Sequence, residues 1–130
     1  MMLRRALLGL AAVLAMAVLA TPAQADPIPF EAGAFAAAQK AGRPILVEVS
    51  APWCPICKTQ KPILASLSAE PRFKDLAVFT IDFDSQRDLV RRFEARMQST
   101  LIVYKGKTEV GRSVGETQPE WIEQLLEKAL

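Results

Sequence analysis

Residues 45–58 have the sequence ILVEVSAPWCPICK. The first five residues form an apolar run, rich in β-branched side chains and broken by one carboxylate, which is typical of a central strand buried on both faces. A turn follows at Ala51-Pro52-Trp53, and helical spacing of apolar residues begins after it. Cys54 is therefore predicted to stand where a buried strand ends and a helix begins.

The position of Cys54 predicts a reactive sulfur. Unpaired backbone N–H groups and the helix dipole at a helix N-terminus favour a thiolate there. Cys57 follows one helical turn later on the same side, close enough to attack a mixed disulfide at Cys54 and release the reduced substrate. The pair predicts a two-step thiol–disulfide exchange, with Cys54 as the nucleophile and Cys57 as the resolving thiol.

Two other interpretations of the cysteine pair stay open. As a structural staple, a closed loop of four residues contributes only about 2 kcal/mol, against roughly 5 kcal/mol for a loop of about 100 residues. As a metal site, the pair is half of a zinc centre, but the chain has two cysteines and no histidine to complete it. We therefore favour redox chemistry over a metal shared between chains, and we expect no bound metal and no cofactor.

The beginning of the 130-residue chain is typical of a cleaved signal peptide covering residues 1–25. A charged start, a short Ala/Leu/Val stretch and the small-x-small motif Ala23-Gln24-Ala25 predict cleavage before Asp26. The apolar stretch of about 15 residues is shorter than the roughly 20 that cross a bilayer, so an uncleaved anchor is the weaker alternative. We expect a soluble domain over residues 26–130, exported by the Sec pathway to the oxidising periplasm.

The charge balance and the absence of histidine argue against some further classes of function and exclude others. The chain has 16 Lys and Arg against 14 Asp and Glu, and two of the arginines, Arg4 and Arg5, lie in the predicted leader. The mature domain is then balanced in charge, which gives no reason to expect nucleic-acid binding. The absence of histidine excludes His-based triads and His general bases.

The rest of the pattern predicts an α/β fold. Helices are expected over residues 30–41, 54–69 and 85–93 and from Pro119 onward, and strands over residues 45–49, 77–83, 100–104 and 109–113, with an extended lead-in at 27–29. Asp84 or Ser85 is expected to cap the third helix, and the segment from Thr117 to Glu120 has the form of a capping box. This order predicts a mixed sheet with crossover helices on its faces.

From Pro44 to the C-terminus, the sequence resembles the thioredoxin superfamily. The resemblance rests on residues 45–58, on Pro62 five residues after the second cysteine, on residues 81–84 and 100–104, and on Val114-Gly115. It implies a thioredoxin fold, a central mixed β-sheet flanked by helices on both faces, with a redox-active disulfide between Cys54 and Cys57. It also implies that Cys54 is the exposed nucleophile and Cys57 the buried resolving thiol.

Glu48 is the anomaly of the buried strand. By resemblance it occupies the place of a buried acid, usually Asp, beneath the second cysteine, and would accept a proton from Cys57. A physical argument supports a raised pKa for a carboxyl in an apolar strand, because desolvation disfavours the charged form. The alternative is that Glu48 reaches solvent at the edge of the strand.

Ser99 departs from the family pattern. Thioredoxins have a cis-proline immediately before the hairpin strand, where this chain has Ser99 before Thr100. A cis bond before a non-proline residue costs about 2.5 to 4 kcal/mol, so we expect a trans bond. Three hypotheses stay open: the Ser99 hydroxyl donates to the Cys54 thiolate, the lost proline leaves room for a metal or iron–sulfur cluster held by cysteines of two chains, or Ser99 is a tolerated turn residue.

The surface around Cys54 is predicted to bind an extended partner peptide. Trp53, Pro55 and Ile56 are expected to line it, together with Ser99, and the resemblance implies backbone hydrogen bonds from Gln98. The Pro55-Ile56 dipeptide offers no side-chain donor to a Cys54 thiolate, which favours a reducing over a strongly oxidising protein.

The sequence thus predicts a monomeric periplasmic thiol–disulfide oxidoreductase that reduces disulfides of exported proteins. Such a reductant needs electrons, so we expect a membrane electron donor as its partner. Two alternatives stay open: a disulfide oxidase or isomerase, and a non-catalytic thioredoxin-fold module that binds a metal or an iron–sulfur cluster between chains.

Overall fold

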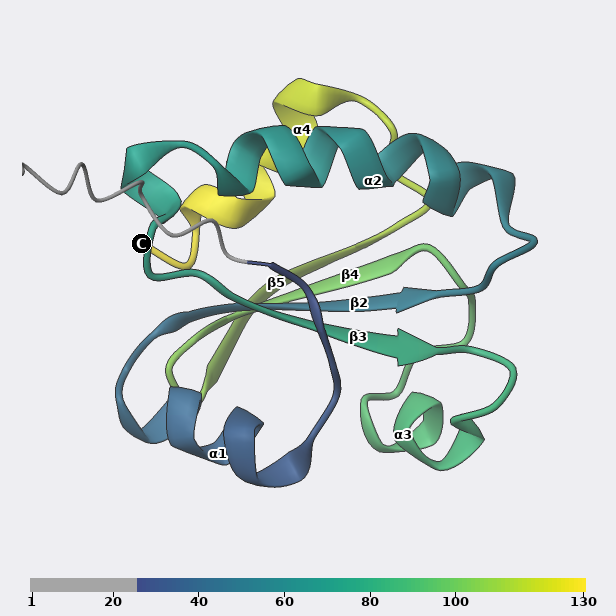
Figure 1. Cartoon of the computed structure of the whole chain (residues 1–130), viewed down its shortest axis with the longest axis horizontal. Helices are drawn as coiled ribbons and strands as arrows, with labels where there is room; N and C mark the ends of the chain where they lie inside the picture. Colours follow the sequence, from purple (N-terminus) through teal and green to yellow (C-terminus); the bar gives the residue numbers. More distant parts are fainter. Residues whose placement is uncertain (1–25) are drawn as a thin grey trace, which may run out of the picture.

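The computed structural model describes residues 26–130, so the predicted signal peptide lies outside the described residues. The described chain forms a five-stranded sheet in the order β1-β3-β2-β4-β5. Helices α2 and α4 cover one face of the sheet, and α1 and α3 cover the other (Figure 1). Over residues 26–130, no helix is both long enough and apolar enough to cross a membrane.

The predicted elements after residue 30 are all present. The strands are β1 (Ile28–Pro29), β2 (Pro44–Ser50), β3 (Ala77–Asp82), β4 (Thr100–Lys105) and β5 (Thr108–Val114). The helices are α1 (Ala32–Lys40), α2 (Pro55–Ser68), α3 (Arg87–Arg92) and α4 (Pro119–Glu127), with a 3₁₀ turn at Pro71–Phe73. The sheet is mixed, because β3 runs parallel to β1 and β2 whereas β4 runs antiparallel to β2 and β5.

The expected lead-in is a short edge strand. Ile28 pairs with Phe79 and Pro29 pairs with Thr80, both in parallel register. An edge position suits proline, which has no N–H to donate to a second neighbour. A strand of two residues is too short to give a period-2 pattern, so the sequence predicted its extended backbone but not its pairing.

The sheet separates two apolar cores. The core under α1 and α3 contains an aromatic cluster with ring centroids between 5.3 and 6.4 Å apart: Phe30, Phe35, Phe79, Phe93 and Tyr104. Ile45, Val47 and Val49 of β2 face this core, whereas Leu46 faces the core under α2 and α4. Side chains alternate along a strand, so Glu48 shares the face of Leu46 and lies beneath α2.

Two predicted helix caps are wrong. Neither Asp84 nor Ser85 caps α3 with its side chain, and the Asp82 carboxylate instead accepts hydrogen bonds from the backbone N–H groups of both, at 2.9 and 2.8 Å. Thr117 does not cap α4, and its own N–H donates to the Glu116 carboxylate at 3.0 Å. In each case a carboxylate ahead of the helix orders the turn that leads into it.

Strand register brings three loops to one end of the sheet. Val49 in β2 lies opposite Thr100 in β4, and Thr100 lies opposite Val114 in β5. The turn that carries Cys54, the loop before β4 and the loop after β5 therefore meet at the right-hand end of the sheet in Figure 1.

Candidate active site

Cys54 and Cys57 are joined by a disulfide at the start of α2. Cys54 is the N-cap of this helix, and the backbone N–H of Cys57 donates to its Sγ at 3.1 Å. Pro55 occupies the first turn, where a missing N–H leaves no hydrogen bond unmade. The Cys54 sulfur thus lies at the positive end of the helix dipole, which favours the thiolate once the disulfide is reduced.

Both cysteines are buried. Cys54 is 1% exposed and Cys57 is 3% exposed, and they pack with Ala51 and Phe83. The expectation of an exposed Cys54 is therefore wrong for the disulfide form, because the side chains around the α2 N-terminus cover both sulfurs. Attack on this disulfide by another thiol requires those neighbouring side chains to move.

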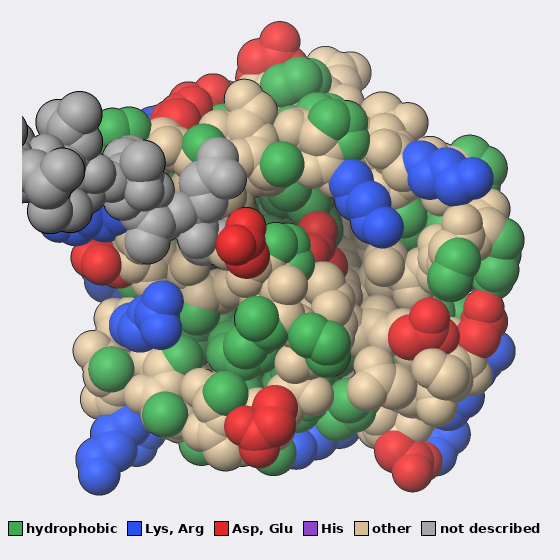
Figure 2. Space-filling model, in the orientation of Figure 1, with side chains coloured by type: hydrophobic (Ala, Val, Ile, Leu, Met, Phe, Trp, Pro, Cys, Tyr) green, Lys and Arg blue, Asp and Glu red, His purple; other side chains and the backbone are tan. Residues whose placement is uncertain are grey.

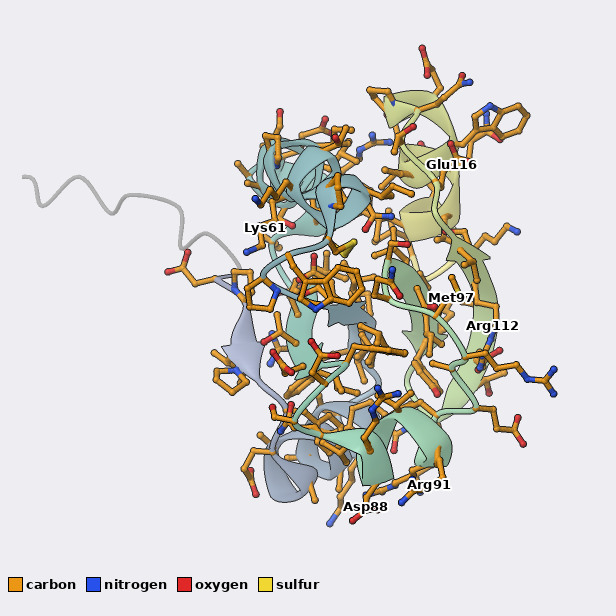
Figure 3. The ribbon with its side chains drawn as sticks, turned by 90° about the vertical axis from the view of Figure 1, so that its right-hand side faces the viewer. Lys61, Asp88, Arg91, Met97, Arg112 and Glu116 are labelled. Atoms are coloured by element: carbon orange, nitrogen blue, oxygen red, sulfur yellow. A yellow bond between two sulfur atoms is a disulfide. The ribbon has the colours of Figure 1, made fainter. Side chains whose placement is uncertain are left out.

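Exposed apolar side chains surround the buried disulfide. Trp53 is 55% exposed, and its indole N–H donates to the Asp84 carboxylate at 2.6 Å, which orients the ring. Pro55 and Ile56 are also exposed, as the predicted rim requires. The sequence reasoning missed Met97, which is 51% exposed and lies on the β4–β5 side of the disulfide, opposite Lys61 (Figure 3). A methionine in a loop carries no pattern that would mark it in advance.

Ser99 has a trans peptide bond, as predicted, but its backbone is in the left-handed region with φ of 61°. Its hydroxyl donates to the carbonyl of Gln98, so the hypothesised hydrogen bond to the Cys54 sulfur is not made in this disulfide form. Gln98 itself is half-buried. A substrate peptide that binds the Gln98 carbonyl would share this acceptor with the Ser99 hydroxyl.

The side chain of Gln60 was not predicted to belong to the site. Gln60 lies one turn after Cys57 on α2 and is 3% exposed. Its Nε2 donates to the carbonyl of Ser99 at 3.3 Å and to the carbonyl of Glu116 at 2.9 Å. The available signal in the sequence was a polar residue on the helix face that otherwise carries Leu64 and Leu67.

A cavity of about 440 Å³ lies beside the disulfide, between α2 and the strands β2 and β3. Glu48 and Cys57 both line it, together with Lys61. Figure 2 shows the recess below α2, with apolar side chains and charged groups around it. Burial raises the pKa of Glu48 to about 7, and the positive charge of Lys61 offsets part of this rise. The alternative that Glu48 reaches solvent at the edge of the strand is wrong about the edge, because β2 is the central strand between β3 and β4. The side chain is half-buried at the cavity.

No three Cys, His, Asp or Glu side chains of residues 26–130 lie together in a way that could hold a metal ion. In the disulfide, the two sulfurs bond each other and are not thiolate ligands. The hypothesis of a metal or cluster shared between two chains stays a prediction, since it concerns an assembly of chains.

A family model described as Thioredoxin matches residues 28–128. A bifunctional thioredoxin reductase/thioredoxin from Mycobacterium leprae is 33% identical over 65% of this chain and 18% of its own length. Thioredoxin H2-1 from Oryza sativa is 30% identical over 58% of this chain and 54% of its own length. The chain thus matches less than two thirds of these two relatives.

Solved structures agree with the family match. The crystal structure of Trxlp from Edwardsiella tarda is 44% identical, with a TM-score of 0.75 over 78% of this chain and 98% of that one. Thioredoxin NaTrxh from Nicotiana alata is 26% identical, with a TM-score of 0.69 over 79% of this chain and 91% of that one. The architecture is therefore the thioredoxin fold.

The raised pKa of Glu48 predicts a pH-dependent stability. Its folded-state pKa of about 7 lies above the reference value of 4.5, so the folded state binds the proton more tightly and the free energy of unfolding falls as the pH rises through this window. The loss is about 3 kcal/mol, at roughly 1.4 kcal/mol per pKa unit. Glu48→Gln should remove this fall, as measured by urea denaturation of the oxidised protein at several pH values.

Two further variants serve as controls for this measurement. Lys61→Met removes the neighbouring positive charge and should extend the fall to higher pH. Glu120→Gln removes an exposed acid on α4 and should leave the fall unchanged. A wild-type dependence that persists in Glu48→Gln would show that other groups cause it.

Proposed function

The chain belongs to the thioredoxin family, and we propose that it is an exported reductase of protein disulfides. As a family member it is a thioredoxin-type thiol–disulfide oxidoreductase with a Cys54–Cys57 pair. The observation that carries the proposal is the disulfide at the α2 N-terminus, with Trp53 and Ile56 exposed around it. The family match supports the thiol–disulfide oxidoreductase, whereas export and protein substrates are our proposals.

In the first step, the Cys54 thiolate attacks one sulfur of the substrate disulfide. A bond forms between Cys54 Sγ and that sulfur, the substrate disulfide breaks, and the other substrate sulfur leaves as a thiolate that takes a proton from water. The Cys57 N–H that donates to Cys54 Sγ supports this step, because a hydrogen bond and the helix dipole both stabilise the attacking thiolate.

In the second step, Cys57 resolves the mixed disulfide. The Cys57 thiol gives its proton to the Glu48 carboxylate, and the resulting thiolate attacks Cys54 Sγ, so that the second substrate sulfur leaves and the Cys54–Cys57 bond forms. Two electrons pass from the dithiol to the substrate. Glu48 suits this role because it lines the same cavity as Cys57 and has a pKa of about 7, where a base both accepts and releases a proton near neutral pH.

Reduction is proposed over oxidation on the basis of the two residues between the cysteines. A strongly oxidising protein stabilises its reduced thiolate. Pro55 has no N–H and Ile56 has no polar side-chain group, so neither residue gives the Cys54 thiolate this stabilisation. A reductase must be reduced again after each turnover. We therefore propose a membrane electron donor that passes electrons from the cytoplasm to the Cys54–Cys57 disulfide.

Insulin reduction tests the proposed activity. The mature chain from Asp26, with dithiothreitol as reductant, should precipitate reduced insulin well above the background rate, and Cys54→Ser should lower the rate to background because the nucleophile is lost. Cys57→Ser that is reduced first and then mixed with insulin after removal of the dithiothreitol should accumulate a mixed disulfide, seen by mass spectrometry, because the attack occurs and the resolution does not. A wild-type rate equal to that of Cys54→Ser would contradict the reductase.

The role of Glu48 predicts a change in the pH profile of exchange. In the wild type, the rate constant for resolving the mixed disulfide should rise as Glu48 ionises near pH 7. Glu48→Gln should lose this rise and resolve more slowly at neutral pH, by a factor on the order of a hundred. Glu48→Asp keeps a carboxyl and should restore part of the rate. An identical profile in wild type and Glu48→Gln would remove Glu48 from the reaction.

Export predicts a processed chain. When the full sequence is expressed in a Gram-negative bacterium, the protein in the periplasmic fraction should begin at Asp26 by intact mass. Replacing both Ala23 and Ala25 by Leu should block processing, because signal peptidase requires small residues at these places. Full-length wild-type protein found in the cytoplasm would contradict the export proposal.

A further inference from the structure

Gln60 is an unusual residue for its place in the fold. It lies on the buried face of α2, one turn after Cys57, and is 3% exposed. A buried amide costs stability unless its polar atoms are hydrogen-bonded. The hydrogen bonds of the Gln60 amide therefore offset the cost of burying it at this end of the molecule.

The amide of Gln60 joins α2 to two loops that are distant in sequence. Nε2 donates to the carbonyl of Glu116, after β5, at 2.9 Å and to the carbonyl of Ser99, before β4, at 3.3 Å. The backbone N–H of Gly115 donates to the same Ser99 carbonyl at 3.0 Å. Helix α2, which begins at the disulfide, is thus tied to both loops through one side chain.

These two loops have backbone conformations that need support. Ser99 has φ of 61° and Gly115 has φ of 73°. For a residue with a Cβ, the left-handed conformation costs about 1 to 2 kcal/mol, so Ser99 keeps it only where the surrounding structure imposes it. The hydrogen bonds to the Ser99 carbonyl from Gln60 and Gly115 are such constraints, and Ser99 itself is 4% exposed.

The loop that Gln60 supports lies beside the disulfide, where a partner peptide would align. An extended peptide binds through backbone hydrogen bonds and side-chain contacts, so a mobile loop has to become ordered when the peptide binds. A small aromatic disulfide needs only access to the sulfur. Order in the loop of residues 97–99 therefore matters more for protein substrates than for small ones.

We propose that Gln60 is a positioning residue that gives this oxidoreductase its affinity for protein disulfides by holding the Ser99 and Glu116 carbonyls in place. The inference rests on the proposed function, because it concerns protein substrates of the same site. The Gln60 amide donates to the two loop carbonyls, so we place its action in the two loops.

The test compares two variants of nearly unchanged volume. Gln60→Met and Gln60→Leu each remove both hydrogen-bonding groups and add no charge to the cavity that Gln60 lines together with Cys57 and Glu48. Each should raise the KM for insulin about tenfold, the expected effect of one or two lost hydrogen bonds, with kcat changed much less. The rate constant for reduction of the small disulfide dithionitrobenzoate should stay within about twofold of wild type, since the sulfurs are untouched.

Thr59→Val is the matched control. Thr59 is exposed on the same helix, and its hydroxyl donates only within α2, to the carbonyl of Pro55. It should leave both reactions unchanged. Equal losses on insulin and on dithionitrobenzoate in the Gln60 variants would overturn the proposal, and so would an unchanged KM for insulin. Gln60→Leu keeps the test decisive if Gln60→Met does not fold.

A second measurement separates this inference from the proposed function. Amide hydrogen exchange at Gly115, whose N–H donates to Ser99, should be about tenfold faster in Gln60→Met or Gln60→Leu than in wild type and unchanged in Thr59→Val. Wild-type protein that reduces dithionitrobenzoate but not insulin would refute the proposed function while this exchange still tests the positioning role. Unchanged exchange at Gly115 would refute that role.

Discussion

The burial of β2 on both faces is the constraint from which the site follows. Ile45, Leu46 and Val47 are each 0% exposed, and they alternate between the core under α1 and α3, which holds the aromatic cluster, and the core under α2 and α4. A shift of the strand by one residue would exchange these side chains between two cores of different shape and would turn Glu48 toward the aromatic rings. Because the register cannot slip, the strand ends at one fixed place, and Cys54 takes its position at the start of α2.

The same register places the Glu48 carboxyl where burial destabilises its charged form. It directs Glu48 toward the cavity below α2, where desolvation raises the pKa to about 7 and Lys61 opposes only part of the effect. Once ionised, the carboxylate is less stable there than in water, so it lowers the stability of the fold. Cys57 lines the same cavity as Glu48. A carboxyl that titrates near neutral pH beside a thiol is what proton transfer between them requires, and a well-packed leucine would give stability without that chemistry.

The parts of the structure that could be predicted from the sequence are those with a local cause. The apolar run of β2, the two cysteines one turn apart and the direction of the Glu48 pKa depend on neighbours in the chain or on burial alone. The pairing of Ile28 with Phe79, the burial of Cys54 and the bonds of Gln60 depend on segments that meet only in the folded chain. The failed caps are a local exception, since Asp82 and Glu116 accept hydrogen bonds from N–H groups one to three residues away, in turns whose shape the capping motif does not specify.

The loop that contains Ser99 is held by hydrogen bonds from other parts of the fold as well as by hydrogen bonds within the loop. A proline restricts the backbone of its own loop through its ring, whereas serine leaves the loop free to adopt several conformations. In this chain two hydrogen bonds within the loop restrict it, from the Ser99 hydroxyl to the Gln98 carbonyl and from the Thr100 hydroxyl to the Met97 carbonyl. The N–H of Gly115 and the amide of Gln60 add a restriction from outside the loop, through the Ser99 carbonyl. This second restriction exists only while α2, β4 and β5 are packed together. The shape of the surface beside the disulfide is therefore coupled to the helix that begins with the cysteines, and the Gln60 side chain is a direct link by which a change in the position of α2 reaches the loop.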